Sequence, residues 1–312
     1  MNTIPQDQLM QKQLDRLAAQ RHLYSKAKKV LAGQIILSVP PVIIWSLIVL
    51  AKPELKVWSA FWGFCVAILD PALFNLWQQS LKQQAAKIQE LFDCDVLQLE
   101  WRELKVGRRP DAEAIMDSST KFKKSNSDYS FLKDWYPQVG VLPLHLARII
   151  CQRVNCWWDA KLRRRYAVWV ITIVVILSVF TFLIGLVGGL TLEKFLLVVL
   201  FPLAPVITLG TRQYIEHKQA AEALDRLKEH SEKLWEKAKA KFTSEELTKG
   251  SRDLQDEIYD RRCKNPLIFD WIHNRLRRKH EEQMNVGAKE LIEEAKAAGF
   301  TDITNTNSDD QS

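Results

Sequence analysis

The sequence lacks every common catalytic signature. Its 312 residues contain no G-x-x-x-x-G-K-[ST] phosphate loop, no G-x-S-x-G elbow, no H-E-x-x-H zinc motif and no G-x-G-x-x-G fingerprint. Histidine is scarce: His145 stands alone on an apolar helix, and His273 and His280 lie among arginines. Because no nucleophile is paired with a base, we expect no enzymatic activity and no bound cofactor.

Cysteine is also sparse. The five cysteines are an odd number, and no two have the C-x-x-C spacing of a zinc or redox site. Cys65 falls within an apolar run, and the other four lie on the side predicted to be cytoplasmic, where thiols stay reduced. The sequence therefore predicts neither a disulfide framework nor a metal centre.

Charge is nearly missing from four long stretches. Residues 167–190 form an uncharged run, and roughly 20 apolar residues in a helix cross a hydrocarbon core of about 30 Å. After a short turn, residues 195–210 lead back, because a helix end left in lipid would strand its backbone polar groups. The same unit occurs upstream at residues 30–51 and 57–77. The pattern predicts two transmembrane hairpins.

The basic residues predict the orientation of these hairpins. Residues 1–29 hold 6 Lys and Arg against 2 Asp and Glu, and Arg163, Arg164 and Arg165 precede the third run. The positive-inside rule therefore places both termini and the central segment in the cytoplasm, as in a multi-pass membrane protein. The first run is too long for a signal peptide and has no small-residue cleavage site behind it.

The predicted fold class is a mostly α integral membrane protein with four spans, helical cytoplasmic extensions and a small mixed central cytoplasmic segment. Its expected divisions follow the chain: an N-terminal cytoplasmic amphipathic helix (1–29), the first transmembrane hairpin (30–77), the central segment (78–166), the second transmembrane hairpin (167–212), C-terminal cytoplasmic helices (213–300) and a disordered tail (301–312).

Local patterns add four expectations. The apolar stripes after the second and fourth runs predict that these two helices pack together as a cytoplasmic stalk. Residues 94–101 alternate well enough to be a strand. Asn265 with Pro266 reads as the cap and start of the last helix. Asp70 before Pro71 is either the N-cap of a new helix or an intramembrane acid that binds ions.

Few polar residues lie inside the spans. Gln34 and Ser38 are four apart and share a face of the first helix, so we predict that they line a pore together with Asp70. The alternative is ordinary hydrogen bonding between helices. One copy cannot line a water-filled path, because four helices close into a packed core, so a pore requires a homo-oligomer.

The central segment combines cations with aromatic rings. Cations neutralise phosphates and aromatic rings stack on bases, so these side chains suit a nucleotide. The candidate nucleotide-binding residues are Arg108, Arg109, Lys123, Lys124, Tyr129 and Trp135. For the cations, a solvated surface is the equal alternative.

Three stretches carry a resemblance to a known family. They are AAKIQELFDCDVLQLEW after the second span, LKDWYP at 132–137, and ARIICQRVNCWWDAKLRRRY before the third span. With the two hairpins, they resemble the SMODS-associated four-transmembrane effectors of bacterial anti-phage systems. The resemblance covers nearly the full chain. It implies a pore-forming effector of the bacterial inner membrane that is encoded beside a second-messenger synthase. A cyclic di- or oligonucleotide would trigger this effector. It supplies no catalytic residues.

Two functions follow. The first is an effector that binds a cyclic nucleotide in the cytoplasm and oligomerises in the lipid bilayer to permeabilise it, with no direct DNA binding. The second is a membrane anchor or scaffold that recruits a cytoplasmic partner through its charged helices.

The predicted topology is testable with reporter fusions. Fusions after residues 54 and 192 should report the outer side of the membrane, and fusions after residues 125 and 305 the cytoplasm, because the basic residues flank the runs on one side. A cytoplasmic reading at residue 54 would contradict the two-hairpin arrangement.

Overall fold

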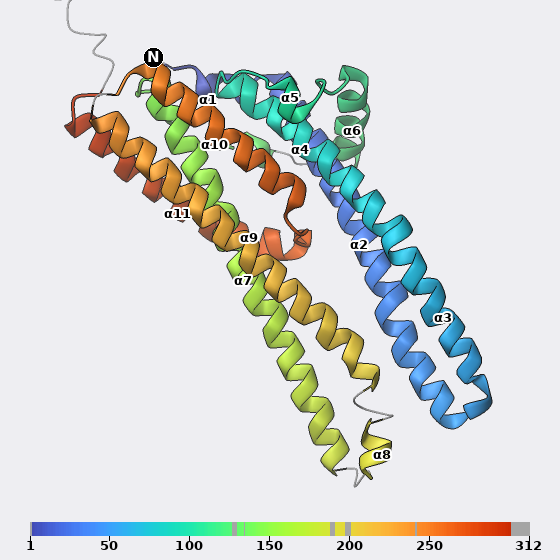
Figure 1. Cartoon of the computed structure of the whole chain (residues 1–312). Helices are drawn as coiled ribbons and strands as arrows, with labels where there is room; N and C mark the ends of the chain where they lie inside the picture. The colour runs from blue at the N-terminus through green and yellow to red at the C-terminus, as the bar shows by residue number, and fades with distance from the viewer. Residues whose placement is uncertain are drawn as a thin grey trace, which may run out of the picture.

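The structure is a computed structural model that describes residues 2–126, 130–133, 135–187, 191–196, 201–240 and 242–300. Over these residues the protein is all-helical, without a strand. Two long hairpins diverge from a broader helical body that holds the N-terminus, and both hairpin turns lie at the opposite end (Figure 1).

The first hairpin consists of α2 (Gln11–Ala51), the turn η1 (Pro53–Leu55), α3 (Lys56–Leu69), the π-helical segment η2 (Asp70–Asn75) and α4 (Leu76–Val96). Helix α2 continues through Pro40 and Pro41. Asp70 is the first residue of η2, and the chain stays helical on both sides of it. The interpretation of Asp70 as the N-cap of a new helix is therefore wrong, because an N-cap has a non-helical backbone.

The second hairpin pairs α7 (Leu144–Val187) with α9 (Phe201–Lys239), and the short α8 (Leu192–Phe195) lies at its turn. The two long helices come very close at Gly210 of α9. A Cβ atom there would lie 2.2 Å from Cγ2 of Val174, a β-branched side chain with little rotamer freedom. Only glycine permits this close approach.

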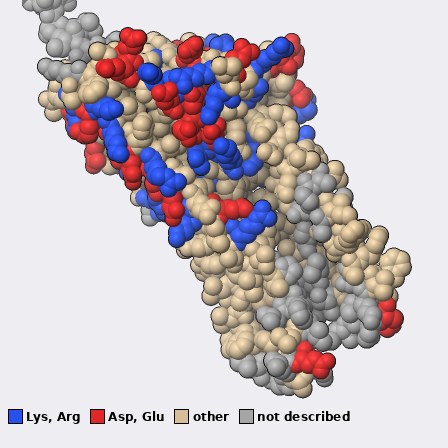
Figure 2. Space-filling view, viewed as in Figure 1, with Lys and Arg blue, Asp and Glu red and all other residues tan. Residues whose placement is uncertain are grey.

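Charged side chains gather over the helical body, and the two hairpin arms are almost free of them except near their tips (Figure 2). The arms instead expose large apolar side chains, among them Trp58 at 61%, Phe64 at 64%, Ile176 at 61% and Phe180 at 62% of their surface. Over the described ranges, no helix combines the length and the apolar character needed to cross a membrane.

The central segment is helical, with α5 (Glu103–Val106), α6 (Ala112–Ser125) and the 3-10 turn η3 (Ser130–Leu132). The predicted strand at 94–101 is wrong. Helix α4 extends to Val96 and ends where Gln98 adopts a φ of 51°, with the Leu99 amide bonded to the Cys94 carbonyl at 2.8 Å. In this left-handed helix cap, backbone amides donate to the last carbonyls of the helix, so they cannot donate to a neighbouring strand.

Helix α10 (Ser244–Lys264) packs on α4, α7 and α9 and so takes the place of the stalk predicted from α4 and α9. The last helix, α11 (Asp270–Ala297), packs on α7. Its N-cap is Phe269, so the prediction that Asn265 and Pro266 start this helix is wrong. Residues 265–269 instead form an irregular link between α10 and α11.

The N-terminal arm docks on the body. A short helix, α1 (Ile4–Asp7), precedes α2, and the Asn2 side-chain amide donates to the carbonyls of Val139 and Leu142, both at 2.7 Å. Leu17 of α2 is fully buried in the main core, which also contains Phe92 of α4. The predicted disordered tail, residues 301–312, lies outside the described residues.

Candidate functional site

A cavity of about 940 Å³ lies where the two hairpins meet the helical body, at the ends opposite their turns. One side is formed by α2, α6 and η3, and the other by α7, α10 and the link at 265–269. Its size is at the upper end of the range for small-molecule sites, about 300–1,000 Å³.

The cavity wall is strongly basic. Its lining holds eight lysines and arginines (Arg21, Lys26, Lys28, Lys29, Lys121, Arg163, Arg261 and Arg262) against two acids (Asp159 and Asp270). Such a wall concentrates positive potential in a concave site and attracts anions.

Aromatic rings share the same wall. The lining includes Tyr24, Phe122, Phe131, Trp135, Tyr136, Trp158, Phe269 and Trp271. The Arg21 guanidinium lies over the Phe131 ring at 5.0 Å and over the Trp135 ring at 5.8 Å, a cation–π arrangement that fixes its position. Cations and aromatic faces in one cavity match the phosphates and bases of a nucleotide.

Three side-chain donors of lining residues are buried without a hydrogen-bond partner among the described residues. They are Nε of Arg261, Nη2 of Arg262 and Nδ2 of Asn265. A buried donor without an acceptor costs about 1–3 kcal/mol. An acceptor-rich ligand that shifts these side chains slightly would recover this energy.

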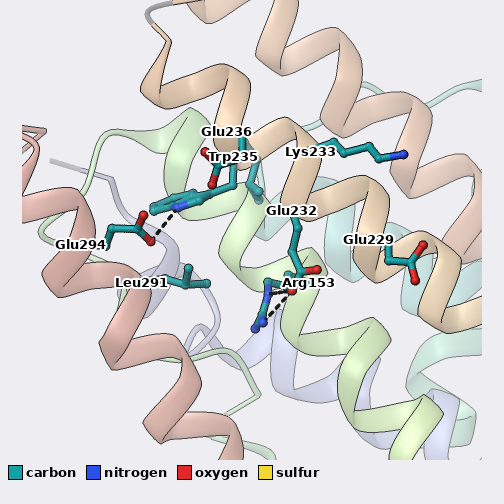
Figure 3. Close-up of a pocket in the computed structure, with 9 residues that line it drawn as sticks. Arg153, Glu229, Glu232, Lys233, Trp235, Glu236, Leu291 and Glu294 are labelled. Atoms are coloured by element: carbon teal, nitrogen blue, oxygen red, sulfur yellow. Dashed lines mark hydrogen bonds and ion pairs between the residues drawn. The ribbon is translucent and has the colours of Figure 1, made fainter.

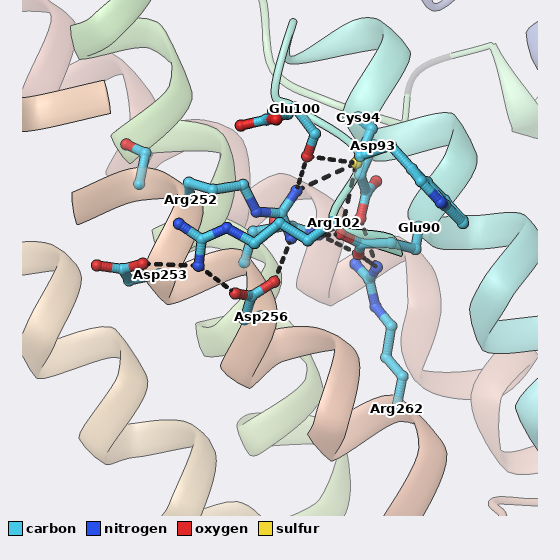
Figure 4. Close-up of polar contacts among 12 residues, drawn as sticks. Glu90, Asp93, Cys94, Glu100, Arg102, Arg252, Asp253, Asp256 and Arg262 are labelled. Carbon is cyan, nitrogen blue, oxygen red and sulfur yellow. Dashed lines mark hydrogen bonds and ion pairs between the residues drawn. The ribbon is translucent and has the colours of Figure 1, made fainter. Parts of the chain in front are cut away.

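A buried ion network stands behind this wall and joins α4 to α10 (Figure 4). Arg252 donates to Glu90 at 2.7 Å, and Arg262 pairs with Asp93. Neither carboxylate is exposed, and Arg252 has only 4% of its side chain exposed. The Tyr136 hydroxyl donates to Asp93 at 2.6 Å, so the network reaches the cavity through two lining residues, Arg262 and Tyr136.

Proton equilibria in this network follow from burial and charge. Burial alone would lower the pKa of both Arg252 and Arg262, but the carboxylates of Glu90 and Asp93 outweigh it and raise both values. Burial and the charge of Asp93 raise the pKa of Tyr136 well above its usual value. Both arginines therefore stay charged, and the Tyr136 hydroxyl keeps its proton.

A second, smaller cavity of about 570 Å³ has the opposite charge (Figure 3). Four glutamates line it (Glu229, Glu232, Glu236 and Glu294) with Arg153 and Lys233. Arg153 already pairs with Glu232 at 2.8 Å, and Glu294 accepts from Trp235 at 3.1 Å. An excess of carboxylates disfavours an anionic ligand here, so the larger basic cavity is the candidate site.

The predicted nucleotide-binding residues are not brought together. Trp135 lines the basic cavity. Arg109 lies over the Trp101 ring at 5.9 Å, and Arg108 beside it is exposed. Lys123 pairs with Asp15 of α2, and Lys124 is exposed at the end of α6. Tyr129 lies outside the described residues.

The predicted pore residues are placed on the first hairpin. Gln34 of α2 accepts a hydrogen bond from Gln78 of α4, as in the alternative of ordinary bonding between helices. Ser38 lies one turn further along α2 and Asp70 in η2, and the side chains of both are outside what the structure describes. Their role in a pore stays a prediction.

The cations that the N-terminal arm and the C-terminal segment contribute to the cavity were missed in the sequence: Arg21, Lys26, Lys28, Lys29, Arg261 and Arg262. Arg21 and Lys28 belong to an arm whose basic residues served as a topology signal, and Arg261 and Arg262 belong to a C-terminal segment with a slight acidic excess. The sequence feature that could have revealed them is the adjacent pair of Arg261 and Arg262, which lies one turn before a helix end at Asn265.

The fold and the site define an all-helical protein of two apolar hairpins with a basic, aromatic-lined cavity at their base. Residues 2–291 match the SMODS-associating 4TM effector domain family, and the chain belongs to this family. It is 25% identical over 278 residues to a probable CBASS effector molecule of Bacillus cereus strain VD146, with 87% of this chain and 92% of that protein covered. No solved structure matches the chain significantly.

The arginines of the ion network should contribute unequally to the free energy of unfolding, according to how deeply each is buried. We expect Arg252→Met to lower the free energy of unfolding by about 3–5 kcal/mol, because buried Glu90 loses its nearest cation and keeps only the Gln255 amide at 2.8 Å and the more distant Arg262 at 3.9 Å. Arg102→Met is the matched control: Arg102 contacts Asp256 as Arg252 does but is 36% exposed, so its loss should cost less than about 1 kcal/mol. Denaturant unfolding followed by circular dichroism measures both, and equal losses would contradict the burial argument.

Proposed function

We propose that this chain is a non-enzymatic membrane effector of anti-phage signalling, triggered by a cyclic oligonucleotide bound in the basic cavity. Its family is one of effector domains, and its relative from Bacillus cereus is described as a probable CBASS effector. The observation that carries the proposal is one cavity that unites eight cationic and eight aromatic residues at the base of two apolar hairpins.

The hairpin arms support a place in the bilayer. Trp58, Phe61 and Phe64 of α3 and the exposed apolar side chains of α7 give the arms apolar faces of the kind that mark membrane or protein contacts. The description of the family as 4TM agrees with four spans. In this arrangement the charged body lies in the cytoplasm and the hairpin turns face outward.

The cavity chemistry supports the ligand class. A cyclic oligonucleotide carries one negative charge for each phosphodiester and one flat base for each nucleotide, so it needs several cations and stacking faces within one enclosure. The basic cavity supplies both, and three of its donors still lack an acceptor.

The permeabilising step requires several copies. Within one copy, Gly210 of α9 touches α7, so the second hairpin has no room for water between its helices at this point. A conducting path therefore forms between copies. The ligand favours that assembly by binding the assembled state more tightly than the single chain.

Binding should depend on the cavity rather than on the loop after α5. We expect Arg261→Gln and Lys121→Gln each to weaken binding of a cyclic oligonucleotide by about 1.5–3 kcal/mol, the value of a charged hydrogen bond. Trp135→Ala should cost about 1–3 kcal/mol through lost stacking. Arg108→Glu with Arg109→Glu should leave the affinity unchanged. Calorimetry with cyclic di- and triadenylate, cyclic diguanylate and the mixed cyclic dinucleotide measures each change.

These variants separate two locations for the site. Loss of binding only in the Arg108 and Arg109 variant, or in Lys123→Glu with Lys124→Glu, would move the site to the surface predicted from the sequence. Normal binding in every variant would contradict both locations. No binding to the wild-type protein would favour the scaffold function.

Membrane damage should require the ligand and a high protein density. Liposomes that contain the protein should release small ions only after addition of the nucleotide that binds, with a steep dependence on copies per vesicle, because assembly precedes conduction. Equal leakage with and without nucleotide, or none at any density, would count against a ligand-gated pore.

A further inference from the structure

The link between α10 and α11 is a wedge, residues 265–269, between the two hairpins. Leu267 packs into a cluster with Leu31 of α2 and Leu81 of α4. The next residue, Ile268, packs with Leu162 and Tyr166 of α7. Consecutive side chains of the wedge therefore contact opposite hairpins, and the wedge sets the distance between them.

Helices from both hairpins hold the backbone of the wedge. Lys82 of α4 donates to the carbonyl of Asn265 at 3.2 Å, and Arg163 of α7 donates to the carbonyl of Pro266 at 2.8 Å. Asp270 follows directly and accepts from Ser25 at 3.0 Å and from Lys28 at 2.5 Å, both on α2. The ion pair of Lys28 with Asp270 thus fixes the C-terminal end of the wedge to the first hairpin.

This ion pair lies in the cavity wall. Lys28 and Asp270 both line the basic cavity, and the side chain of Lys28 is only 16% exposed, whereas that of Asp270 is 47% exposed. Burial lowers the pKa of Lys28, and the charge of Asp270 opposes this. A buried ammonium needs an anionic partner, and a phosphate is a second candidate for that place.

We propose that the Lys28–Asp270 ion pair is a latch, and that a phosphate of the bound nucleotide takes Lys28 from Asp270 and so releases the wedge. The inference rests on the proposed function, since it names how the same cavity is regulated. When the phosphate reaches Lys28, two like charges face each other across the ammonium, and Asp270 is repelled. The wedge then loses its ion pair with α2, which weakens its hold on the first hairpin, and the hairpins change their separation and assemble.

The latch predicts opposite effects of its two partners on affinity. Asp270→Asn removes the competitor of the phosphate, so nucleotide affinity should stay equal or rise. Lys28→Gln removes the phosphate contact, so affinity should fall about tenfold or more. A merely structural ion pair would lower the melting temperature in both variants without this split. Ser25→Ala removes one bond to Asp270 and serves as the milder variant if Asp270→Asn fails to fold.

The release itself is measurable by hydrogen exchange of the full-length protein in lipid nanodiscs. Amides of residues 267–272 should exchange about tenfold faster in wild-type protein after addition of the cyclic nucleotide that binds in calorimetry, and in Asp270→Asn without it. Inorganic phosphate is the ligand control. Asp260→Asn is the matched variant, because Asp260 pairs with Lys105 at 3.0 Å and neither residue lines the cavity. It should leave exchange at 267–272 unchanged.

The outcomes separate the latch from the proposed function. Nucleotide binding without any change at 267–272 would overturn the latch and leave the effector function intact. Fast exchange in Asp270→Asn with no nucleotide binding to the wild type would overturn the nucleotide as trigger, and the effector function with it. Slow exchange in Asp270→Asn would overturn the latch whatever the ligand does.

Discussion

The buried ion pairs between α4 and α10 are the constraint on which the rest of the structure depends. Glu90 and Asp93 lie without exposure inside the body, and each needs the guanidinium that α10 supplies. Because an unpaired buried charge costs several kcal/mol, α10 has one acceptable position along α4. That position delivers Arg261, Arg262 and Asn265 to the cavity wall and directs the following link between the two hairpins. The cavity is thus a consequence of how the body satisfies its own charges.

The same arrangement joins the cavity to the hairpins. Arg262 pairs with Asp93 in the body, and its Nη2 has no hydrogen-bond partner among the residues that the structure describes. The wedge that follows touches α2 and α4 with one side chain and α7 with the next. A charge placed in the cavity therefore acts on groups that belong at once to the fold and to the spacing of the hairpins. The cavity wall and the contacts between the hairpins share the same residues, so no separate domain has to connect them.

The sequence predicted the helices well where periodicity or long apolar runs were strong. The two helical hairpins follow from the four long apolar runs. The predicted strand failed because alternation over Val96, Leu97 and Leu99 is also what a capped helix end with two buried leucines looks like. The stalk failed because apolar stripes show that a partner exists but not which one: α4 packs mainly on α2 and α9 mainly on α7, and α10 contacts both α4 and α9.

The site was only partly predictable for a related reason. Composition pointed to cations together with aromatic rings, and Trp135 lines the basic cavity, where its role in nucleotide binding stays a prediction. The cations that join it come from residues over two hundred positions apart, such as Arg21 and Arg261, and no local pattern can signal that they meet. Arg108 and Arg109 share a segment with Trp135 but not its cavity.

The wide sequence separation of the cavity wall also matters during synthesis. Its lining runs from Gln20 to Met284, and contacts between distant segments form late because the intervening chain must first be made and ordered. Both hairpins are therefore complete before residues 265–270 have been added to the chain. In that interval the helices α2, α4 and α7 expose the apolar side chains that Leu267 and Ile268 cover in the finished fold.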